Sequence, residues 1–348
     1  MKLFELTRKL IDIPSVTGDE KAVGEFLKSH LQHLGYQVEM QEVAEDRFNV
    51  IATTGAVPRI VFSTHMDTVP PHIVSSEDEE RIYGRGACDA KGIIAAQIAA
   101  AERLRADGVD SIGLLFTVDE ETGSLGAQVA NKNKPAGQSE YLINGEPTDL
   151  KLARATKGSL RLTLKTVGRA SHSAYPEQGE SAIEKLLDIL DRIRKTDWPK
   201  DDILGETTCN IGLISGGTRA NVVPASAQAV LQLRLVTEAR PVKAILEAAI
   251  EGRAEVEYLS EHDPVHLLTI DSLDQCVVRF TTDIPYLSHW GTPLLLGPGS
   301  ILNAHTDHEF VEKRELVEAV ELYAKLGREL LARKTGDNVN KATEGAPR

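Results

Sequence analysis

The sequence contains only three cysteines, which are too scattered to form a disulfide framework. Cys88, Cys209 and Cys276 lie far apart, and none belongs to a Cys-x-x-Cys pair. Such cysteine usage is typical of a reducing compartment. The first ten residues combine helical periodicity with interspersed charges and lack the apolar core of a signal peptide. Together these features predict a cytoplasmic protein.

Long apolar runs and an excess of basic residues are also missing. No apolar run approaches the length that a membrane-spanning helix needs. The chain carries 39 Lys and Arg residues against 52 Asp and Glu residues, which gives a formal net charge of −13. This charge disfavours nucleic acid or an anionic membrane as the main partner. Bound metal ions would offset part of it.

A nucleotide-binding glycine motif is missing as well. The glycine-rich stretch Gly84-Arg-Gly-Ala-Cys-Asp89 matches neither the dinucleotide fingerprint nor the P-loop pattern. A Rossmann-type nucleotide-binding protein is therefore disfavoured.

Strand and helix patterns alternate regularly in the first half of the 348-residue chain. Hydrophobic residues make up 41% and charged residues 26%, which is ordinary for a globular protein of a length that predicts two domains. Apolar runs predict strands at 48–52, 59–64, 112–118 and 141–144, and helical periodicity predicts helices at 2–11, 19–34 and 91–106. This alternation predicts an α/β domain with a doubly wound, mostly parallel sheet.

The pattern changes near Lys157. Alternating leucines over 159–167 predict a half-exposed antiparallel strand. The sequence then predicts a helix at 181–194, strands at 207–214 and 227–236, a helix with Pro241 in its first turn, and a strand at 255–259. Together with the strand at 159–167, these elements give the β-α-β-β-α-β order of a ferredoxin-like α+β domain. We expect residues 157–267 to form this domain, inserted in a discontinuous domain made of 1–156 and 268–335 that ends in a helix at 312–331. Residues 336–348 are expected to be a disordered tail, and the cleft between the domains is the expected ligand site.

Three adjacent carboxylates, Asp119, Glu120 and Glu121, follow one of the predicted buried strands. Adjacent carboxylates repel one another unless a cation or a proton compensates them. In open α/β sheets, ligands bind outside the carboxyl ends of the strands. The alternative is a solvated acidic turn that caps the helix predicted around 124–131. The rest of the chain is needed to decide between the two.

Other side chains that bind metals follow other predicted elements. They are His65, Asp89, Glu146 and, late in the chain, His305 with its neighbour His308. Each has a simpler explanation, because Asp89 could cap a helix, His65 could be a core residue, Glu146 could be a turn residue, and the late histidines could lie in a surface loop. Several such residues at the expected ligand edge of one sheet nevertheless favour a shared site.

Two histidines and at least three carboxylates suit two zinc ions better than one, because about seven ligand atoms exceed one tetrahedral site. A His, Asp and Glu set without cysteine also accepts cobalt or manganese. Asp89 can bridge the two ions, which leaves one histidine and one glutamate for each. Asp67, two residues after His65, is placed to orient that imidazole.

One carboxylate of the Glu120–Glu121 pair is then free for proton transfer. Adjacent residues beyond a strand end point in different directions, so one of them can bind metal while the other faces the cleft. Paired metals lower the pKa of a bound water and polarise a carbonyl oxygen. The free glutamate can take a proton from that water and later hand it to a leaving amine. The pattern therefore predicts metal-assisted amide hydrolysis.

At these residues the sequence resembles the M20 metallopeptidase family, which includes acetylornithine deacetylase, succinyl-diaminopimelate desuccinylase and carboxypeptidase G2. The matching pieces occur in the family's order over nearly the whole chain, and they are His65-Met-Asp-Thr-Val-Pro70, Gly84–Gly92, Asp119-Glu-Glu-Thr-Gly123, Gly145-Glu-Pro-Thr148, Ser171-His-Ser173, Asn221-Val-Val-Pro224 and His305. Any one of them is weak, whereas the ordered set is specific. One departure is Ala90, because many relatives carry Asp or Asn after the residue that matches Asp89.

The resemblance implies a metal ligand set. Asp89 bridges two Zn²⁺ ions, His65 and Glu146 complete one site, and Glu121 and His305 complete the other. His305 is preferred to its neighbour because it follows an alanine and precedes a glutamate at the family's spacing.

The resemblance also implies catalytic and substrate-binding roles. Glu120 is the general base and then the general acid, and Asp67 supports catalysis from behind the metal site. His172, in the inserted domain, polarises the scissile carbonyl, often from the partner subunit, and the alternative is an ordinary turn histidine. The substrate carboxylate is bound by Asn221 and Arg234, with Arg219 as a further candidate. An arginine offers a carboxylate a planar fork, although Arg234 could equally lie on the solvated face of a strand.

The function implied by the resemblance is zinc-dependent removal of an acyl group from an N-acyl-α-amino acid in amino-acid biosynthesis. The chain length and Gly297-Pro-Gly-Ser-Ile301 point to the branch that acts on acetylornithine or N-acetyl-lysine. Alternatives are a di- or aminopeptidase, a succinyl-diaminopimelate desuccinylase or, in another class, a non-catalytic metal-binding relative, which the presence of Glu120 disfavours. The implied substrate is a small N-acyl amino acid or a short peptide. The resemblance also implies a homodimer, in which the inserted domain serves as the lid and forms the contact between the two copies. Neither nucleic acid nor a membrane is expected.

Overall fold

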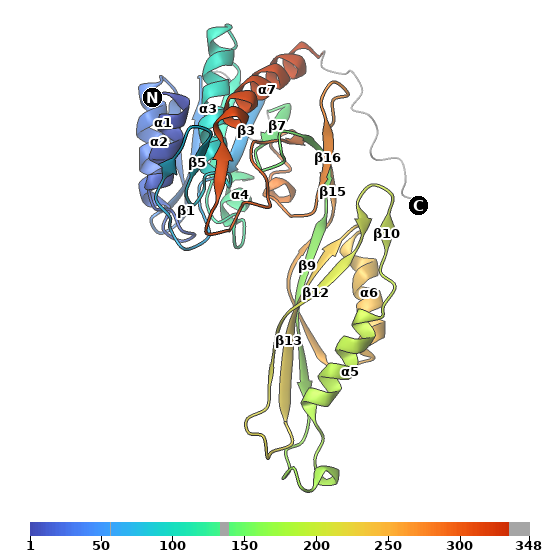
Figure 1. Ribbon diagram of the computed structural model, residues 1–348. Coiled ribbons are helices and arrows are strands. Elements are labelled where there is room, and N and C mark those ends of the chain that lie inside the picture. The colour runs from blue at the N-terminus through green and yellow to red at the C-terminus, as the bar shows by residue number, and fades with distance from the viewer. Residues whose placement is uncertain (56, 133–138, 334–348) are drawn as a thin grey trace. The chain divides into compact units, whose positions relative to one another are not determined.

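The computed structural model describes residues 1–55, 57–132 and 139–333, and the chain divides into two compact units (Figure 1). The larger unit comprises Met1–Arg154, Leu267–Cys276 and Thr282–Arg348, and the smaller unit comprises Ala155–His266 and Val277–Thr281. The tail predicted at 336–348 lies outside the described residues. Among the residues that are described, none of the helices combines the length and apolar character needed to cross a membrane.

A six-stranded sheet forms the centre of the larger unit, with the strand order β1-β2-β6-β3-β7-β17. Its strands are β1 (Gln37–Ala44), β2 (Arg47–Thr53), β3 (Ile60–His65), β6 (Ile112–Thr117), β7 (Tyr141–Asn144) and β17 (Thr292–Leu295). The four strands β6, β3, β7 and β17 run parallel, and β2 joins β6 in the antiparallel sense. The prediction of a doubly wound, mostly parallel sheet is confirmed.

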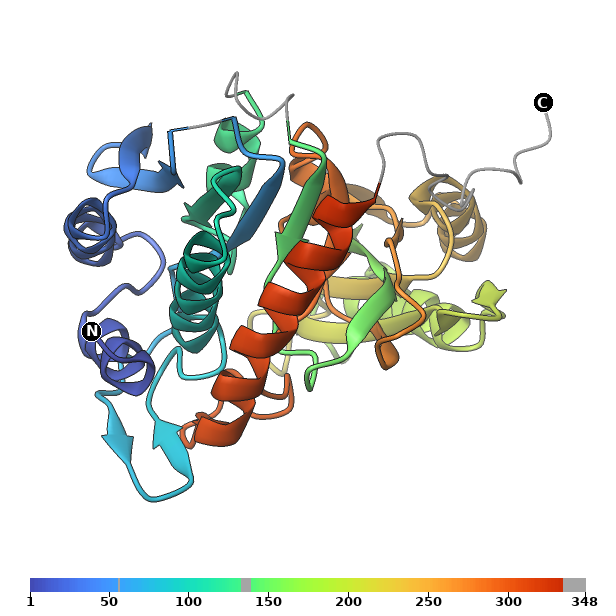
Figure 2. The same ribbon diagram turned by 90° about the horizontal axis from the view of Figure 1, so that it is seen from above.

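Helices cover both faces of this sheet. One core contains residues of α1 (Leu3–Asp12), α2 (Lys21–His33), α3 (Lys91–Ala106) and α7 (Lys313–Ala332). The helices α3 and α7 lie side by side across the sheet (Figure 2). A second core contains residues of α4 (Leu125–Ala130) and residues around the short 3-10 helix η3 (Ile284–Tyr286).

The two cores follow from the alternation of side chains along each strand. Phe62 and Leu114 belong to the first core, whereas their neighbours Val61 and Leu115 pack with Trp290 in the second. Because both faces are buried, β3 and β6 are apolar throughout, and this is the pattern that made them recognisable in the sequence.

A four-stranded antiparallel sheet with the order β12-β13-β9-β14 forms most of the smaller unit. Its elements are β9 (Gly158–Val167), α5 (Ala182–Arg194), β12 (Thr208–Gly216), β13 (Ser226–Leu235), α6 (Ala239–Ile250) and β14 (Glu255–His262). Leucines of β9 and β13 pack in one core with residues of both helices. This is the predicted ferredoxin-like arrangement.

Several short strands complete the structure. They were not predicted, and neither were the strands β1 and β17 of the central sheet. One three-stranded sheet consists of β18 (Phe310–Glu312), β5 (Arg81–Tyr83) and β4 (Ser76–Glu77), and another of β15 (Val265–His266), β8 (Leu152–Thr156) and β16 (Gln275–Val278). The remaining elements are the hairpin of β10 (Lys200–Asp201) with β11 (Gly205–Glu206) and the 3-10 helix η2 (Pro176–Gln178). Runs of two to five residues carry too little periodicity to stand out.

Candidate metal centre

The larger unit gathers histidine and carboxylate side chains at the carboxyl ends of its parallel strands. His65 is the last residue of β3, Glu120 and Glu121 follow β6, and Glu146 follows β7. Asp89 lies two residues before α3. Parallel strands end at the same edge of a sheet, so their order in the sheet brings these residues together.

Asp89 lies between two histidines. Its Oδ1 is 2.9 Å from Nε2 of His65, and its Oδ2 is 3.3 Å from Nε2 of His305. Nε2 of His305 is also 3.0 Å from Oε1 of Glu121. Ligand atoms of His65, Asp89 and Glu121 all lie within 4.8 Å of one another. Each carboxylate oxygen of Asp89 therefore faces a different group of potential ligands, as a carboxylate that bridges two cations would.

The structure places His305 rather than His308 beside these carboxylates. Hydrogen bonds with Asp89 and Glu121 raise the pKa of His305 to about 10. His308 is exposed. The family's spacing favoured His305 in the sequence, and the structure places the same histidine beside the carboxylates.

The centre is strongly acidic, and its burial is uneven, because His65, Asp89 and Glu146 are buried, Glu120 and Glu121 are partly buried, and His305 is exposed. Burial, with nearby carboxylates such as Glu146, raises the pKa of Glu120 well above its usual value. Burial likewise raises the pKa of Glu146, whose Oε1 is buried without a hydrogen-bond partner among the described residues. Burial alone would raise the pKa of Asp89 too, but hydrogen bonds from both histidines hold it below its usual range. A bound cation would give the unpaired Oε1 of Glu146 a partner. It would also compensate the clustered carboxylates. With Asp89 between two groups of potential ligands, these residues fit two divalent cations.

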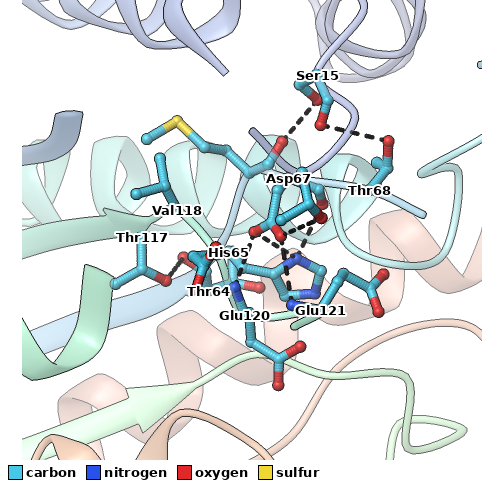
Figure 3. Close-up of polar contacts among 12 residues, drawn as sticks. Ser15, Thr64, His65, Asp67, Thr68, Thr117, Val118, Glu120 and Glu121 are labelled. Atoms are coloured by element: carbon cyan, nitrogen blue, oxygen red, sulfur yellow. Dashed lines mark hydrogen bonds and ion pairs between the residues drawn. The ribbon is translucent and has the colours of Figure 1, made fainter. Parts of the chain in front are cut away.

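Asp67 fixes the backbone of the site (Figure 3). Its carboxylate accepts hydrogen bonds from the backbone N–H groups of Glu120 at 3.1 Å and Glu121 at 3.3 Å. Its backbone oxygen lies 3.0 Å from Nδ1 of His65. The side chains of Glu120 and Glu121 point in different directions from these neighbouring backbone positions (Figure 3). One of them can therefore bind a cation while the other stays free.

Two further residues complete this part of the site and were not recognised in the sequence. The hydroxyl of Thr17 donates to Oδ2 of Asp67 at 2.8 Å. The hydroxyl of Thr117 donates to Oδ2 of Asp283 at 2.7 Å, and Oδ1 of Asp283 is buried without a partner among the described residues. Burial raises the pKa of Asp283 to about 6. No local pattern marks either residue, because each contact joins distant parts of the chain.

The smaller unit places three of the remaining candidates in two adjacent loops. The backbone N–H of Ser173, next to His172, donates to the backbone oxygen of Asn221 at 3.1 Å. Arg219 lies two residues before Asn221, and all three candidate side chains are exposed. These loops lie beyond the ends of β9 and β12 and just before β13 begins.

Arg234 lies at the opposite end of β13 from these loops. It lies eight positions after Ser226 at the start of the strand, which corresponds to about 26 Å. It is half-buried and lies near Arg161 of β9, whose Nε donates to Oε1 of Gln232 at 2.9 Å. Within the chain, the structure therefore does not bring Arg234 together with Arg219 and Asn221.

Comparisons with known proteins agree with this architecture. The model of peptidase family M20/M25/M40 matches residues 61–329. A peptidase M20 domain-containing protein of Schizosaccharomyces pombe is 37% identical over 93% of this chain and 84% of its own length. A probable carboxypeptidase of Aspergillus terreus is 38% identical over 92% of this chain and 84% of its own length. The crystal structure of a tripeptidase from Staphylococcus aureus superposes with a TM-score of 0.78 at 21% identity, and the match covers 94% of this chain and 98% of that one.

Proposed function

The chain belongs to peptidase family M20/M25/M40, and from this premise we propose that it uses two divalent cations to cleave an amide bond beside a free carboxylate. Membership makes the chain a metal-dependent hydrolase of amide bonds. Relatives named as probable carboxypeptidases support a substrate with a free carboxyl group. A short peptide and an N-acyl-α-amino acid share this chemistry, since the scissile nitrogen of either can belong to an amino acid with a free carboxylate.

The observation that carries the proposal is the position of Asp89 between His65 and His305. We assign Asp89 as the ligand shared by both cations. His65 and Glu146 would hold one cation, and Glu121 and His305 would hold the other. Zinc fits this donor set, and cobalt or manganese would also be accepted.

Glu120 is assigned to proton transfer. Bound cations would polarise the substrate carbonyl and make water a stronger nucleophile. The Glu120 carboxylate accepts the proton of the attacking water and then donates it to the leaving nitrogen. A carboxylate in this place can accept a proton and later return it. Asp67 keeps Glu120 in place through the backbone N–H.

The substrate carboxylate is assigned to the smaller unit. Among the described residues, neither Arg161 nor Arg234 forms an ion pair with a carboxylate. Burial and the neighbouring Arg161 lower the pKa of Arg234. An anionic ligand would compensate these two guanidinium groups, and a guanidinium binds a carboxylate through two parallel hydrogen bonds.

The distance between Arg234 and the loops that carry Arg219 and Asn221 is the basis for proposing a homodimer. Arg234 and the loops that carry Arg219 and Asn221 can serve one small substrate only if they come from two protomers. His172 lies in the same pair of loops as Asn221. We therefore propose that His172 polarises the scissile carbonyl at the centre of the partner protomer.

The narrower proposal is that the acyl group is acetyl and the amino acid is ornithine or lysine. It is tested by supplying zinc to metal-stripped protein and measuring hydrolysis of N-acetylornithine, N-acetyl-lysine, N-succinyl-diaminopimelate and a set of dipeptides. The matched control for each substrate carries a carboxamide in place of the α-carboxylate. We expect zinc-dependent cleavage of the free acids and at least about tenfold slower cleavage of the amides.

The panel separates the alternatives. Cleavage of N-acetylornithine or N-acetyl-lysine would support the deacylase, whereas cleavage of dipeptides alone would keep the mechanism and move the protein to the peptidases. Equal rates for acids and amides would contradict the carboxylate requirement. Bound cations without cleavage of any substrate would favour the non-catalytic relative.

A further inference from the structure

A buried carboxylate outside the proposed ligand set joins the segments that carry Asp89 and His305. Glu309 lies four residues after His305 and is 1% exposed. Its Oε1 accepts three backbone N–H groups, from Gly86 at 3.0 Å, Cys88 at 3.2 Å and Asp89 at 3.1 Å. The backbone N–H of Asp89 is thus bound directly to a side chain from the late segment.

Arg85 neutralises this carboxylate. Its Nη1 lies 2.6 Å from Oε2 of Glu309, and its own side chain is 1% exposed. The same nitrogen donates to the backbone oxygen of Thr306 at 3.1 Å, beside His305. The two oxygens of Glu309 therefore have separate partners, since one accepts the loop N–H groups and the other accepts the guanidinium.

The loop consists of turns, with a backbone hydrogen bond from the N–H of Ala87 to the oxygen of Gly84 at 3.0 Å, and it contains no helix or strand. It passes through Gly86 at φ +90°, a conformation that disfavours side chains, before it reaches Asp89. Three buried N–H groups that point at one site need an acceptor. In this loop the acceptor is the Oε1 atom of Glu309.

We propose that Glu309 is a positioning residue that sets the cation affinity of the centre, because its Oε1 holds the Gly86–Asp89 loop in register with the His305 segment. The role belongs to the acceptor atom and not to the charge of the Arg85–Glu309 pair. This inference rests on the proposed metal centre. Groups that hold metal ligands in place commonly change metal affinity by about 10- to 100-fold when they are lost.

Two double variants separate the acceptor from the ion pair. Both contain Arg85→Met, which removes the guanidinium, and they differ only in Glu309→Gln or Glu309→Leu. The glutamine variant keeps an oxygen that can accept the three N–H groups, and the leucine variant does not. Metal-stripped proteins are titrated with Zn²⁺ by calorimetry with a competing chelator. We expect the leucine variant to bind zinc about 10- to 100-fold more weakly than the glutamine variant.

A matched control tests for a merely structural effect. Asp263, in the smaller unit, also accepts a backbone N–H, from Ala239 at 2.8 Å. Asp263→Leu should lower the thermal midpoint of the metal-free protein and leave zinc affinity unchanged. Equal zinc affinity in the two double variants would overturn the proposal. A wild-type protein that binds no zinc would overturn the metal centre itself, so the two failures are distinguishable.

A second measurement covers the case in which the leucine variant does not fold. Amide hydrogen exchange is followed in metal-free wild-type protein, together with an exposed turn as reference. The proposal expects the N–H groups of Gly86, Cys88 and Asp89 to be protected before any cation binds. Exchange as fast as that of the exposed turn would overturn it, because the acceptor would then not hold the loop in advance.

Discussion

At the scale of single residues, the site depends on where each carboxylate finds its partners. Asp89 and the Glu120–Glu121 pair were candidate ligands because of their place at the ligand edge of the predicted sheet, and the family resemblance singled out Glu121 from that pair. Asp283 and Thr17 were not, since their contacts join residues 166 and 50 positions apart. Residue type and local pattern can indicate a ligand, but they cannot indicate which buried group supports it.

Glu120→Gln tests the proton-transfer assignment. The amide keeps the shape of the side chain but cannot accept a proton, so kcat should fall by about 10²- to 10⁴-fold while both cations stay bound. Turnover and metal content are measured on the same sample. Glu121→Gln is the neighbouring control, and it should weaken cation binding instead. An active Glu120→Gln protein would show that another group is the base.

Asp283→Asn tests the buried acid beside the site in the metal-free protein. The folded-state pKa of Asp283 is raised to about 6, above the value of about 3.9 in an unfolded chain. The folded state therefore binds this proton more tightly, and its stability falls as the pH rises from about 4 to about 6. The variant should be about 1–3 kcal/mol more stable than the wild type at pH 8, with no such gain at pH 4. Denaturant unfolding at both pH values measures the difference, and an equal effect at both would contradict the assignment.

At the scale of elements, the sequence predicts helices and strands with a clear apolar pattern and misses short or weakly apolar strands. The helix α3 and the strand β7 have the predicted limits, because a long periodic helix and a bounded apolar run are strong signals. The edge strand β1 alternates without a strongly apolar face, and it is defined by pairing with β2 rather than by its own residues. The ligand edge of the sheet was therefore predictable, whereas the side-chain contacts that hold neighbouring elements together around it were not.

Arg47 forms such contacts between elements. At the start of β2, it pairs with Glu20 before α2 at 2.6 Å and with Asp119 after β6 at 2.9 Å. Arg47→Met would leave the fully buried side chain of Glu20 without its counter-charge, so the free energy of unfolding should fall by about 2–4 kcal/mol.

The control for Arg47 is an exposed pair in the same unit. Arg103 pairs with Glu321, and the two side chains are 46% and 51% exposed. Arg103→Met should change the free energy of unfolding by less than about 1 kcal/mol. Denaturant unfolding measures the free energy of unfolding of both variants. Similar losses of stability in the two would mean that the ion pairs of Arg47 contribute no more than an exposed pair.

At the scale of the whole molecule, two units divide the assigned roles. The larger unit carries the proposed cation ligands and Glu120, and the smaller unit carries His172 and the arginines. The sequence predicted both folds because each follows a recognised order of strands and helices. The structure shows that Asn221 precedes the start of β13 and that Arg234 lies near its other end.

Subunit complementation tests the proposed dimer. Glu120→Gln protein and His172→Ala protein should each be nearly inactive alone. After mixing and subunit exchange, the mixed dimer would contain one intact site, made of Glu120 from one chain and His172 from the other. About a quarter of wild-type activity is expected from an equal mixture, because half of the dimers are mixed and one of their two sites works. No recovery in a mixture shown to exchange subunits would contradict the role of His172 in the partner's site.

The central claim is that Asp89 is shared by two cations, and a metal count tests it most directly. Wild-type and Asp89→Ala proteins are stripped, supplied with zinc and dialysed, and bound zinc and hydrolysis are measured on the same samples. The account predicts two zinc ions per chain and full turnover in the wild type, and loss of both ions and of turnover in the variant. An Asp89→Ala protein that still holds two ions would contradict the shared ligand and the mechanism built on it.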